Sequence, residues 1–249
     1  MHRTIREFKQ AQPEEFRPIK SFYLKDTLNE KIWDGDEIDD GIREDLLSIA
    51  EDYVDYLEVD VEVQDIVLMG SLANYNWSSY SDFDVHIIFD FSEINEDREL
   101  VAKYLDAKEK IWKFRHELMV AGYEVELYAQ DLDDKGVSSG QFSLLNNEWI
   151  SKPSREDFEP DEALIKRKSK VIMEQIDEVE HDFEENYSYQ ELADKANRIM
   201  KKLKDNRKKG LDEEGEFSTE NLVFKLLRRN GYICRLMELK SKIYDKQFK

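Results

Sequence analysis

The 249-residue sequence lacks several features that mark secreted and membrane proteins. Its single cysteine, Cys234, excludes an internal disulfide and a cysteine-rich zinc site. No stretch approaches the ~18 consecutive apolar residues of a membrane-spanning helix, and no basic and apolar leader begins the chain. The four prolines and nine glycines form no low-complexity run. We therefore expect a soluble, cytoplasmic protein with no membrane partner.

Basic residues are scarce in the first part of the chain. The formal net charge is −20 at pH 7. Residues 1–160 hold 17 Lys+Arg and 38 Asp+Glu, whereas residues 161–249 hold 20 and 19. Broad binding to duplex DNA depends on neutralising phosphates, so no duplex DNA partner is expected. The acidic part would need metal ions to hold a nucleotide.

The most informative stretch is residues 66–91, IVLMGSLANYNWSSYSDFDVHIIFDF. It predicts a buried strand, a small-residue turn at Gly70-Ser71, and a second strand that begins at Asp82. Because successive strand side chains point to opposite faces, Asp82 and Asp84 share one face. Two carboxylates on one face of an otherwise apolar strand are costly without a partner. A divalent cation such as Mg²⁺ suits them, since it prefers hard oxygen ligands.

Two short motifs and the spacing between them resemble the signature of the nucleotidyltransferase superfamily related to DNA polymerase beta. They are Gly70-Ser71 and, after ten residues, Asp82-Phe83-Asp84-Val85. That family has a hydrophobic-Gly-[Gly/Ser] motif, a spacer, and then Asp-hydrophobic-[Asp/Glu]-hydrophobic. The resemblance covers roughly residues 40–130, where the predicted order of helices and strands also fits. More loosely, the chain resembles predicted nucleotidyltransferases of large phage genomes.

The resemblance implies a metal-dependent nucleotidyltransferase, which moves an NMP from an NTP such as ATP to an acceptor hydroxyl and releases pyrophosphate. Two Mg²⁺ ions, for which Mn²⁺ can substitute, would be held by Asp82, Asp84 and Glu126. Glu126 matches the third acid of the family and would also take the proton of the acceptor hydroxyl. Gly70 and Ser71 would help to hold the triphosphate.

The acceptor stays open: a small molecule, an RNA end, a nucleotide or a protein. Two other functions are compatible with the same residues. A catalytically inert nucleotide- or protein-binding module would use the fold without turnover. A nucleotide second-messenger synthase would use the same chemistry with a nucleotide as acceptor. Products formed from NTPs alone would distinguish this synthase from enzymes that need a separate acceptor.

The choice of the third acid has one competitor. Glu124 lies two residues before Glu126, on the same face of the strand predicted over residues 123–130. Glu126 lies between Val125 and Leu127 and matches the family pattern better, so it is the preferred ligand.

Other polar residues near the acids have two interpretations each. His86 shares the face of the two aspartates, and a structural or site-wall role is favoured over a catalytic one. Ser79, Tyr80 and Ser81 precede the first acid. They either hydrogen-bond a phosphate or form the turn, and Ser81 is the candidate for nucleotide binding.

Apolar periodicity predicts the surrounding helices. Residues spaced by three and four over 38–56 and over 100–118 predict two amphipathic helices, and Gly122 is expected to end the second. Beyond residue 160, three apolar stripes predict a helical bundle, with a kink or a break at Asn230-Gly231. The apolar stripe of the helix predicted over residues 100–118 consists of Leu100, Tyr104, Ala107, Ile111, Phe114 and Leu118.

The predicted fold class is α/β (α+β), a mixed sheet with flanking helices followed by a C-terminal helical bundle. Turn-rich residues 131–160 predict the boundary. We expect a catalytic domain over residues 1–155, which includes an ordered N-terminal arm over residues 1–37, and a helical domain over residues 156–249.

Cations are concentrated in the predicted helical domain. The run from Lys195 to Lys209 either attracts a triphosphate or an RNA acceptor or forms a solvated helix face, and the solvated face is favoured. Arg228 and Arg229 lie in an apolar helical pattern and one of them is expected to clamp a phosphate, with Arg228 as the candidate.

Overall fold

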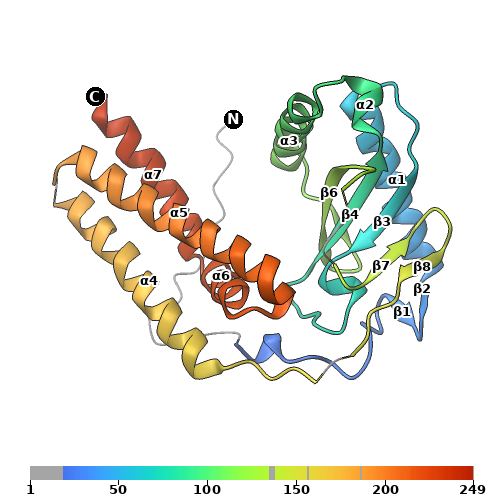
Figure 1. Cartoon of the computed structure of the whole chain (residues 1–249), viewed down its shortest axis with the longest axis horizontal. Coiled ribbons are helices and arrows are strands. Elements are labelled where there is room, and N and C mark those ends of the chain that lie inside the picture. The colour runs from blue at the N-terminus through green and yellow to red at the C-terminus, as the bar shows by residue number, and fades with distance from the viewer. Residues whose placement is uncertain (1–18, 135–137, 156, 186, 249) are drawn as a thin grey trace. The chain divides into compact units, whose positions relative to one another are not determined.

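The chain forms two compact units, shown in Figure 1. The computed structural model describes residues 19–134, 138–155, 157–185 and 187–248. The sheet unit is Leu24–Asp157, and the helical unit combines residues 19–23 with residues 158–248. The predicted class, a mixed α/β fold followed by C-terminal helices, is confirmed.

The N-terminal arm does not belong as a whole to the sheet unit, with which the sequence grouped it. The short helix η1 (Ile19–Phe22) buries Ile19 and Phe22 in the core of the helical unit. The sheet unit begins at Leu24, directly after this helix and Tyr23. Residues 1–18 of the expected arm lie outside the described residues.

A six-stranded mixed sheet forms the centre of the sheet unit. Its strand order is β5-β6-β4-β3-β7-β8, and all neighbours are antiparallel except β4 and β6, which are parallel. The strands are β3 (Asp65–Met69), β4 (Asp82–Phe89), β5 (Met119–Val120), β6 (Tyr123–Asp131), β7 (Gln141–Ser143) and β8 (Glu148–Ser151). A separate hairpin pairs β1 (Trp33–Asp34) with β2 (Glu37–Ile38).

The three strands predicted from the sequence are present, whereas β7 and β8 were not predicted. They are three and four residues long and lie in the turn-rich stretch that we interpreted as a boundary. Such short strands carry too few residues for an alternating pattern to be recognised. Phe142 of β7 is fully buried and packs edge-on against Trp33, so tertiary packing rather than local sequence holds this part of the sheet.

Among the described residues, the α-helices that accompany the sheet are α1 (Asp40–Leu57), α2 (Phe91–Ile94) and α3 (Arg98–Arg115). An aspartate caps each long helix, since the Asp39 side chain accepts a hydrogen bond from the amide of Ile42 and Asp97 accepts one from the amide of Leu100. The predicted stripe of α1 is largely correct, because Leu46 and Tyr53 are fully buried.

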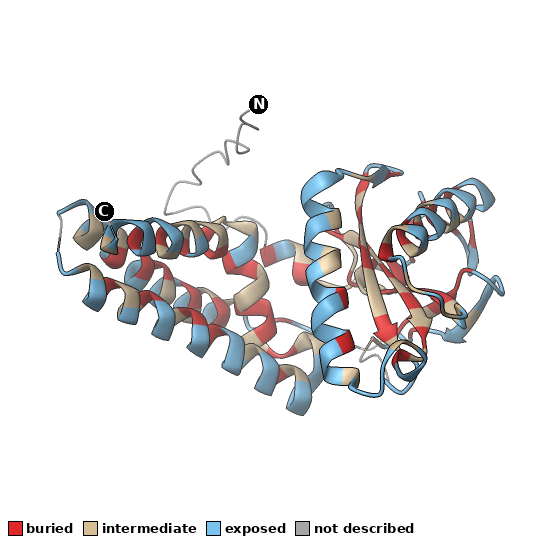
Figure 2. Ribbon diagram, turned by 90° about the horizontal axis from the view of Figure 1, so that it is seen from above, coloured by how far each residue is buried: buried red, intermediate tan, exposed pale blue. Residues whose placement is uncertain are grey.

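The predicted stripe of α3 is on the wrong side of the helix. Leu100, Ile111 and Phe114 are exposed, and the buried residues of the helix are Val101 and Leu105. Figure 2 shows exposed residues over most of α3 and buried residues along the strands. Periodicity thus located the helix but not the face that packs on the sheet.

The end of α3 also differs from the prediction. The helix ends at Arg115 rather than at Gly122. Ala121 and Gly122 instead form the two-residue turn between the antiparallel strands β5 and β6, with φ of 49° and 87°. Two positive φ values are typical of the tight hairpin turn that matches strand twist.

The helical unit contains α4 (Glu162–Glu184), α5 (Tyr189–Glu214), the short η3 (Gly215–Phe217), α6 (Thr219–Arg229) and α7 (Tyr232–Gln247). The third predicted helical pattern is broken into α6 and α7. Gly231, with φ of 78°, adopts the left-handed conformation at the break. The apolar stripes of the four helices meet in one core. Within the described residues, none of the helices combines the length and the hydropathy needed to cross a membrane.

Candidate metal centre

The three predicted acids converge because β4 and β6 are parallel neighbours. Their register sets Glu124 opposite Asp82 and Glu126 opposite Asp84. One carboxylate oxygen from each of Asp82, Asp84 and Glu126 lies within 4.8 Å of the others. In the part of the chain that the structure describes, this is the one group of three potential metal ligands. We call it the acid cluster; it includes Glu126 and leaves out Glu124.

The acid cluster has the donor set that a hard divalent cation prefers. Its three side chains are half-buried, whereas Phe83 and Val85, on the other face of β4, are fully buried in the core. Carboxylates held this close repel one another, and a bound cation relieves that repulsion. Three carboxylates with no nitrogen or sulfur donor fit Mg²⁺ or Mn²⁺ better than Zn²⁺ or copper.

Gly70 allows the chain to pass directly beside Asp84. Its φ of 77° and ψ of −158° lie in a region that is essentially restricted to glycine. A Cβ atom at this position would lie 2.0 Å from Oδ2 of Asp84. The glycine of the predicted motif is therefore required by the position of an acid-cluster carboxylate as well as by the backbone conformation.

Serine hydroxyls join the two ends of the segment between the motifs. Ser71, the first residue of η2 (Ser71–Ala73), donates from Oγ to Oγ of Ser81 at 2.7 Å. The same Ser81 oxygen accepts from the amide of Ser78 at 3.0 Å, and Ser81 is buried. Of the two interpretations of Ser81, the turn-forming one is therefore observed. Phosphate contacts of Gly70, Ser71 and Ser81 stay a prediction.

A second loop supports the turn and was not predicted. The amide of Gly70 donates to Oγ of Ser138 at 3.1 Å. Gly140 brings this loop against η2, where an added Cβ would lie 1.9 Å from the carbonyl oxygen of Ala73. The sequence Ser138-Ser139-Gly140 predicted only a turn. No local pattern indicated that this turn would contact the one at Gly70-Ser71.

Two side chains that the sequence did not single out bind the carboxylate of Glu126. Nζ of Lys113, on α3, forms an ion pair with Oε1, and the phenol of Tyr128 donates to Oε2. Burial and then the charge of Glu126 raise the pKa of Tyr128, so the phenol stays protonated as a donor. Tyr128 could have been found, because it follows Glu126 by two residues on one strand face. The contact of Lys113 with Glu126 could not have been found in this way, because it depends on how α3 packs on the sheet.

His86 forms a wall beside these groups. Its ring stacks on Tyr128 with centroids 4.9 Å apart, as the register of β4 and β6 requires. Burial lowers the pKa of His86, against an opposing hydrogen bond with Gln130, which favours the neutral imidazole. This position agrees with the favoured structural role.

The predicted cations lie in the helical unit. Arg228 is exposed in the last turn of α6, and its role as a phosphate clamp stays a prediction. In the run from Lys195 to Lys209, the first residue pairs with Asp182 at 3.0 Å and the last with Glu213 at 3.8 Å. Such pairs are typical of solvated helix faces.

Comparison with protein-family models, with curated proteins and with solved structures finds no match to this chain. The function must therefore be inferred from the acid cluster and the residues around it.

Proposed function

We propose that this protein is a metal-dependent nucleotidyltransferase, which moves an NMP from an NTP to an acceptor hydroxyl with release of pyrophosphate. The observation that carries the proposal is the convergence of Asp82, Asp84 and Glu126 beside a glycine turn. Gly70 leaves no space for a side chain next to Asp84, so the turn and the carboxylates form one compact site. Packing alone would not require three acids at one place on the sheet.

The roles of the residues follow from their positions. Asp82 and Asp84, two residues apart on β4, would hold the metal ions, and Glu126 would complete the set from β6. Bound divalent ions supply charge neutralisation for the phosphates and lower the pKa of an oxygen nucleophile. Glu126 would accept the proton of the acceptor hydroxyl. The turn at Gly70 and Ser71 would lie against the triphosphate, since phosphate oxygens approach a backbone without bulky side chains most closely.

The test is label transfer from each α-labelled NTP, with Mg²⁺ or Mn²⁺, in the presence and absence of total RNA. The Asp82→Asn/Asp84→Asn double variant should lose about a thousandfold or more of the turnover. It should keep its thermal unfolding midpoint, because both side chains lie on the half-buried face. Asp52→Asn/Asp55→Asn, which removes two exposed acids of α1, is the matched control and should keep full activity.

Each result leads to a definite conclusion. Transfer that persists in the Asp82/Asp84 double variant would refute the assignment of the site. Metal-dependent NTP binding without transfer, with every acceptor class supplied, would favour an inert nucleotide-binding module. A product made from NTPs alone would identify the acceptor as a nucleotide and favour a second-messenger synthase.

A further inference from the structure

The side chain of Lys113 contacts the acid cluster. It lies on α3, and its ammonium group pairs with Oε1 of Glu126. The side chain of Glu126 is 14% exposed and that of Lys113 is 50% exposed. The carboxylate is therefore fixed in the sheet, while the long lysine side chain reaches it from solvent.

The surroundings of this contact are tightly packed. Glu109, Trp112, His116 and Glu124 line the recess between α3 and β6, and its cavity volume is ≈ 10 Å³. That is room for no more than about one water molecule. Burial and the neighbouring charge of Asp106 raise the pKa of Glu109, a further acid beside Lys113. On the side of this recess, the Lys113–Glu126 pair therefore has acidic neighbours and no space for an additional ion.

We propose that Lys113 is a resident cation of the acid cluster, which competes with the divalent metal for Glu126 and so sets the metal affinity. The inference rests on the proposed function, because it requires that the acid cluster binds a metal. An ammonium and a metal ion on one carboxylate repel each other. Metal binding must therefore weaken or break the Lys113–Glu126 pair, and the free energy of that pair is subtracted from metal binding.

A purely supporting role for Lys113 makes the opposite prediction. If the lysine orients Glu126 for the metal, its removal would loosen the ligand and weaken binding. Tyr128, however, already holds the second oxygen of Glu126 from within the same strand. The carboxylate therefore keeps an orienting partner when Lys113 is removed, and competition is the larger effect.

The experiment is a calorimetric titration of Mn²⁺ into the chelator-treated full chain, without nucleotide. Lys113→Met should bind Mn²⁺ about threefold to tenfold more tightly than the parent protein. Lys113→Gln should behave like Lys113→Met, and Lys113→Arg, which keeps the charge, should stay within about twofold of the parent. Lys110→Met is the matched control, because Lys110 lies on the same helix and pairs with Asp106 instead. Its affinity should not change.

The outcomes distinguish this inference from the proposed function. Equal or weaker Mn²⁺ binding by both neutral variants would overturn the competition and leave the metal site standing. An equal gain in Lys113→Arg would also overturn it, because the effect would then not depend on charge. If the parent protein binds no Mn²⁺, or if Asp82→Asn/Asp84→Asn binds it as tightly as the parent, the metal site itself is refuted and the competition with it.

Discussion

Each unit of the protein contains a group of like charges, and the two groups differ in how they are held. In the sheet unit, paired strands bring the acid cluster to one place. In the helical unit, Lys225 lies among Arg207, Arg228 and Arg229. Burial lowers the pKa of Lys225, and the charges of the three arginines lower it further, whereas Glu216 opposes the shift. The two groups differ in origin, because strand register brings the acids together, whereas the cations lie on two packed helices, α5 and α6.

Two of these arginines, Arg207 and Arg229, are engaged in packing. Arg207 donates to Oδ1 of Asn221 at 3.1 Å and lies over the ring of Phe224 at 4.5 Å. Arg229 donates to Oγ of Ser21 at 2.6 Å. These contacts fix the guanidinium groups within the bundle. One carboxylate oxygen from each residue of the acid cluster instead lies within 4.8 Å of the others, so a single cation could contact all three.

The first prediction tests the convergence itself, through effects on both stability and metal binding. Gly70→Ala should cost about 1–3 kcal/mol of unfolding free energy, because alanine strains the backbone at this φ and ψ. It should also weaken Mn²⁺ binding about tenfold or more, since the new Cβ displaces the carboxylate of Asp84. Denaturant unfolding and calorimetry measure the two quantities separately.

The control for this variant is Gly35→Ala. Gly35 has a φ of 61°, but an added Cβ would meet nothing within 4 Å. It should lose stability and keep its Mn²⁺ affinity. Normal metal binding by Gly70→Ala would show that the approach of the turn to Asp84 is not needed for the site.

The second prediction tests the group of cations around Lys225. Lys225→Met should stabilise the protein by about 1 kcal/mol at pH 7, because a half-buried ammonium among arginines is replaced by an apolar side chain. The folded-state pKa of Lys225 is lowered, so the unfolded chain binds more protons between that pKa and about 10.5. The stability of the parent protein therefore gains from rising pH in this window, and the advantage of Lys225→Met should shrink there.

The measurement is denaturant unfolding from pH 7 to pH 10, with Lys208→Met as the control on an exposed position of α5. The difference between each variant and the parent isolates the lysine from other titrating groups. A loss of stability in Lys225→Met would mean that the ammonium has a favourable partner, and the group would then deserve testing as an anion site.

The sequence predicted the residues of the acid cluster better than it predicted the contacts around them. The spacing of Gly70, Asp82 and Asp84 and the strand that contains Glu126 follow from local patterns, because strands alternate with a period of two. Which strands are neighbours does not follow from any local pattern. The parallel pairing of β4 and β6, which brings Glu126 opposite Asp84, is a tertiary fact.

For the helices too, local patterns predicted where each helix lies but not always which face packs on the sheet. The stripes of α1 and α3 are equally regular in the sequence, yet only the stripe of α1 is buried. The face that α3 turns to the sheet contains Val101 and Leu105, and this orientation brings Lys113 to Glu126. Had the predicted face packed on the sheet, Lys113 would point elsewhere. The sequence therefore could not reveal the resident cation.

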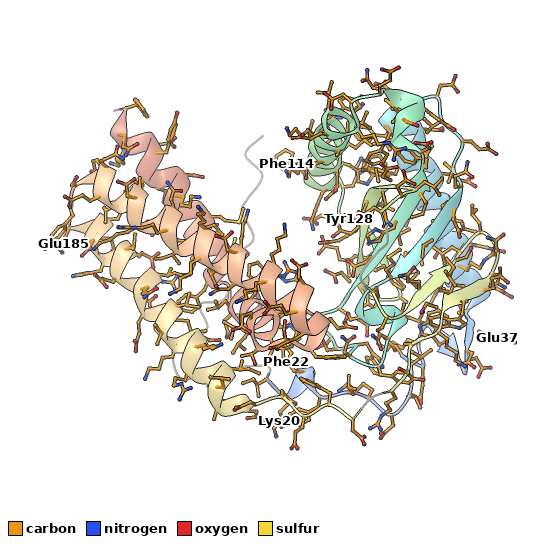
Figure 3. The ribbon with its side chains drawn as sticks, in the orientation of Figure 1. Lys20, Phe22, Glu37, Phe114, Tyr128 and Glu185 are labelled. Carbon is orange, nitrogen blue, oxygen red and sulfur yellow. The ribbon has the colours of Figure 1, made fainter. Side chains whose placement is uncertain are left out.

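The smallest expected effect tests that orientation of α3. Phe114, labelled in Figure 3, is 73% exposed although it belongs to the predicted apolar stripe. Phe114→Ser should change the unfolding free energy by no more than about 0.5 kcal/mol and should leave Mn²⁺ binding unchanged. Leu105→Ala, on the opposite side of the same helix and 2% exposed, should cost about 2–5 kcal/mol. Urea unfolding of both variants measures the contrast. A cost above about 2 kcal/mol for Phe114→Ser would mean that the stripe is buried in the native protein, and Lys113 would then not lie beside the acid cluster.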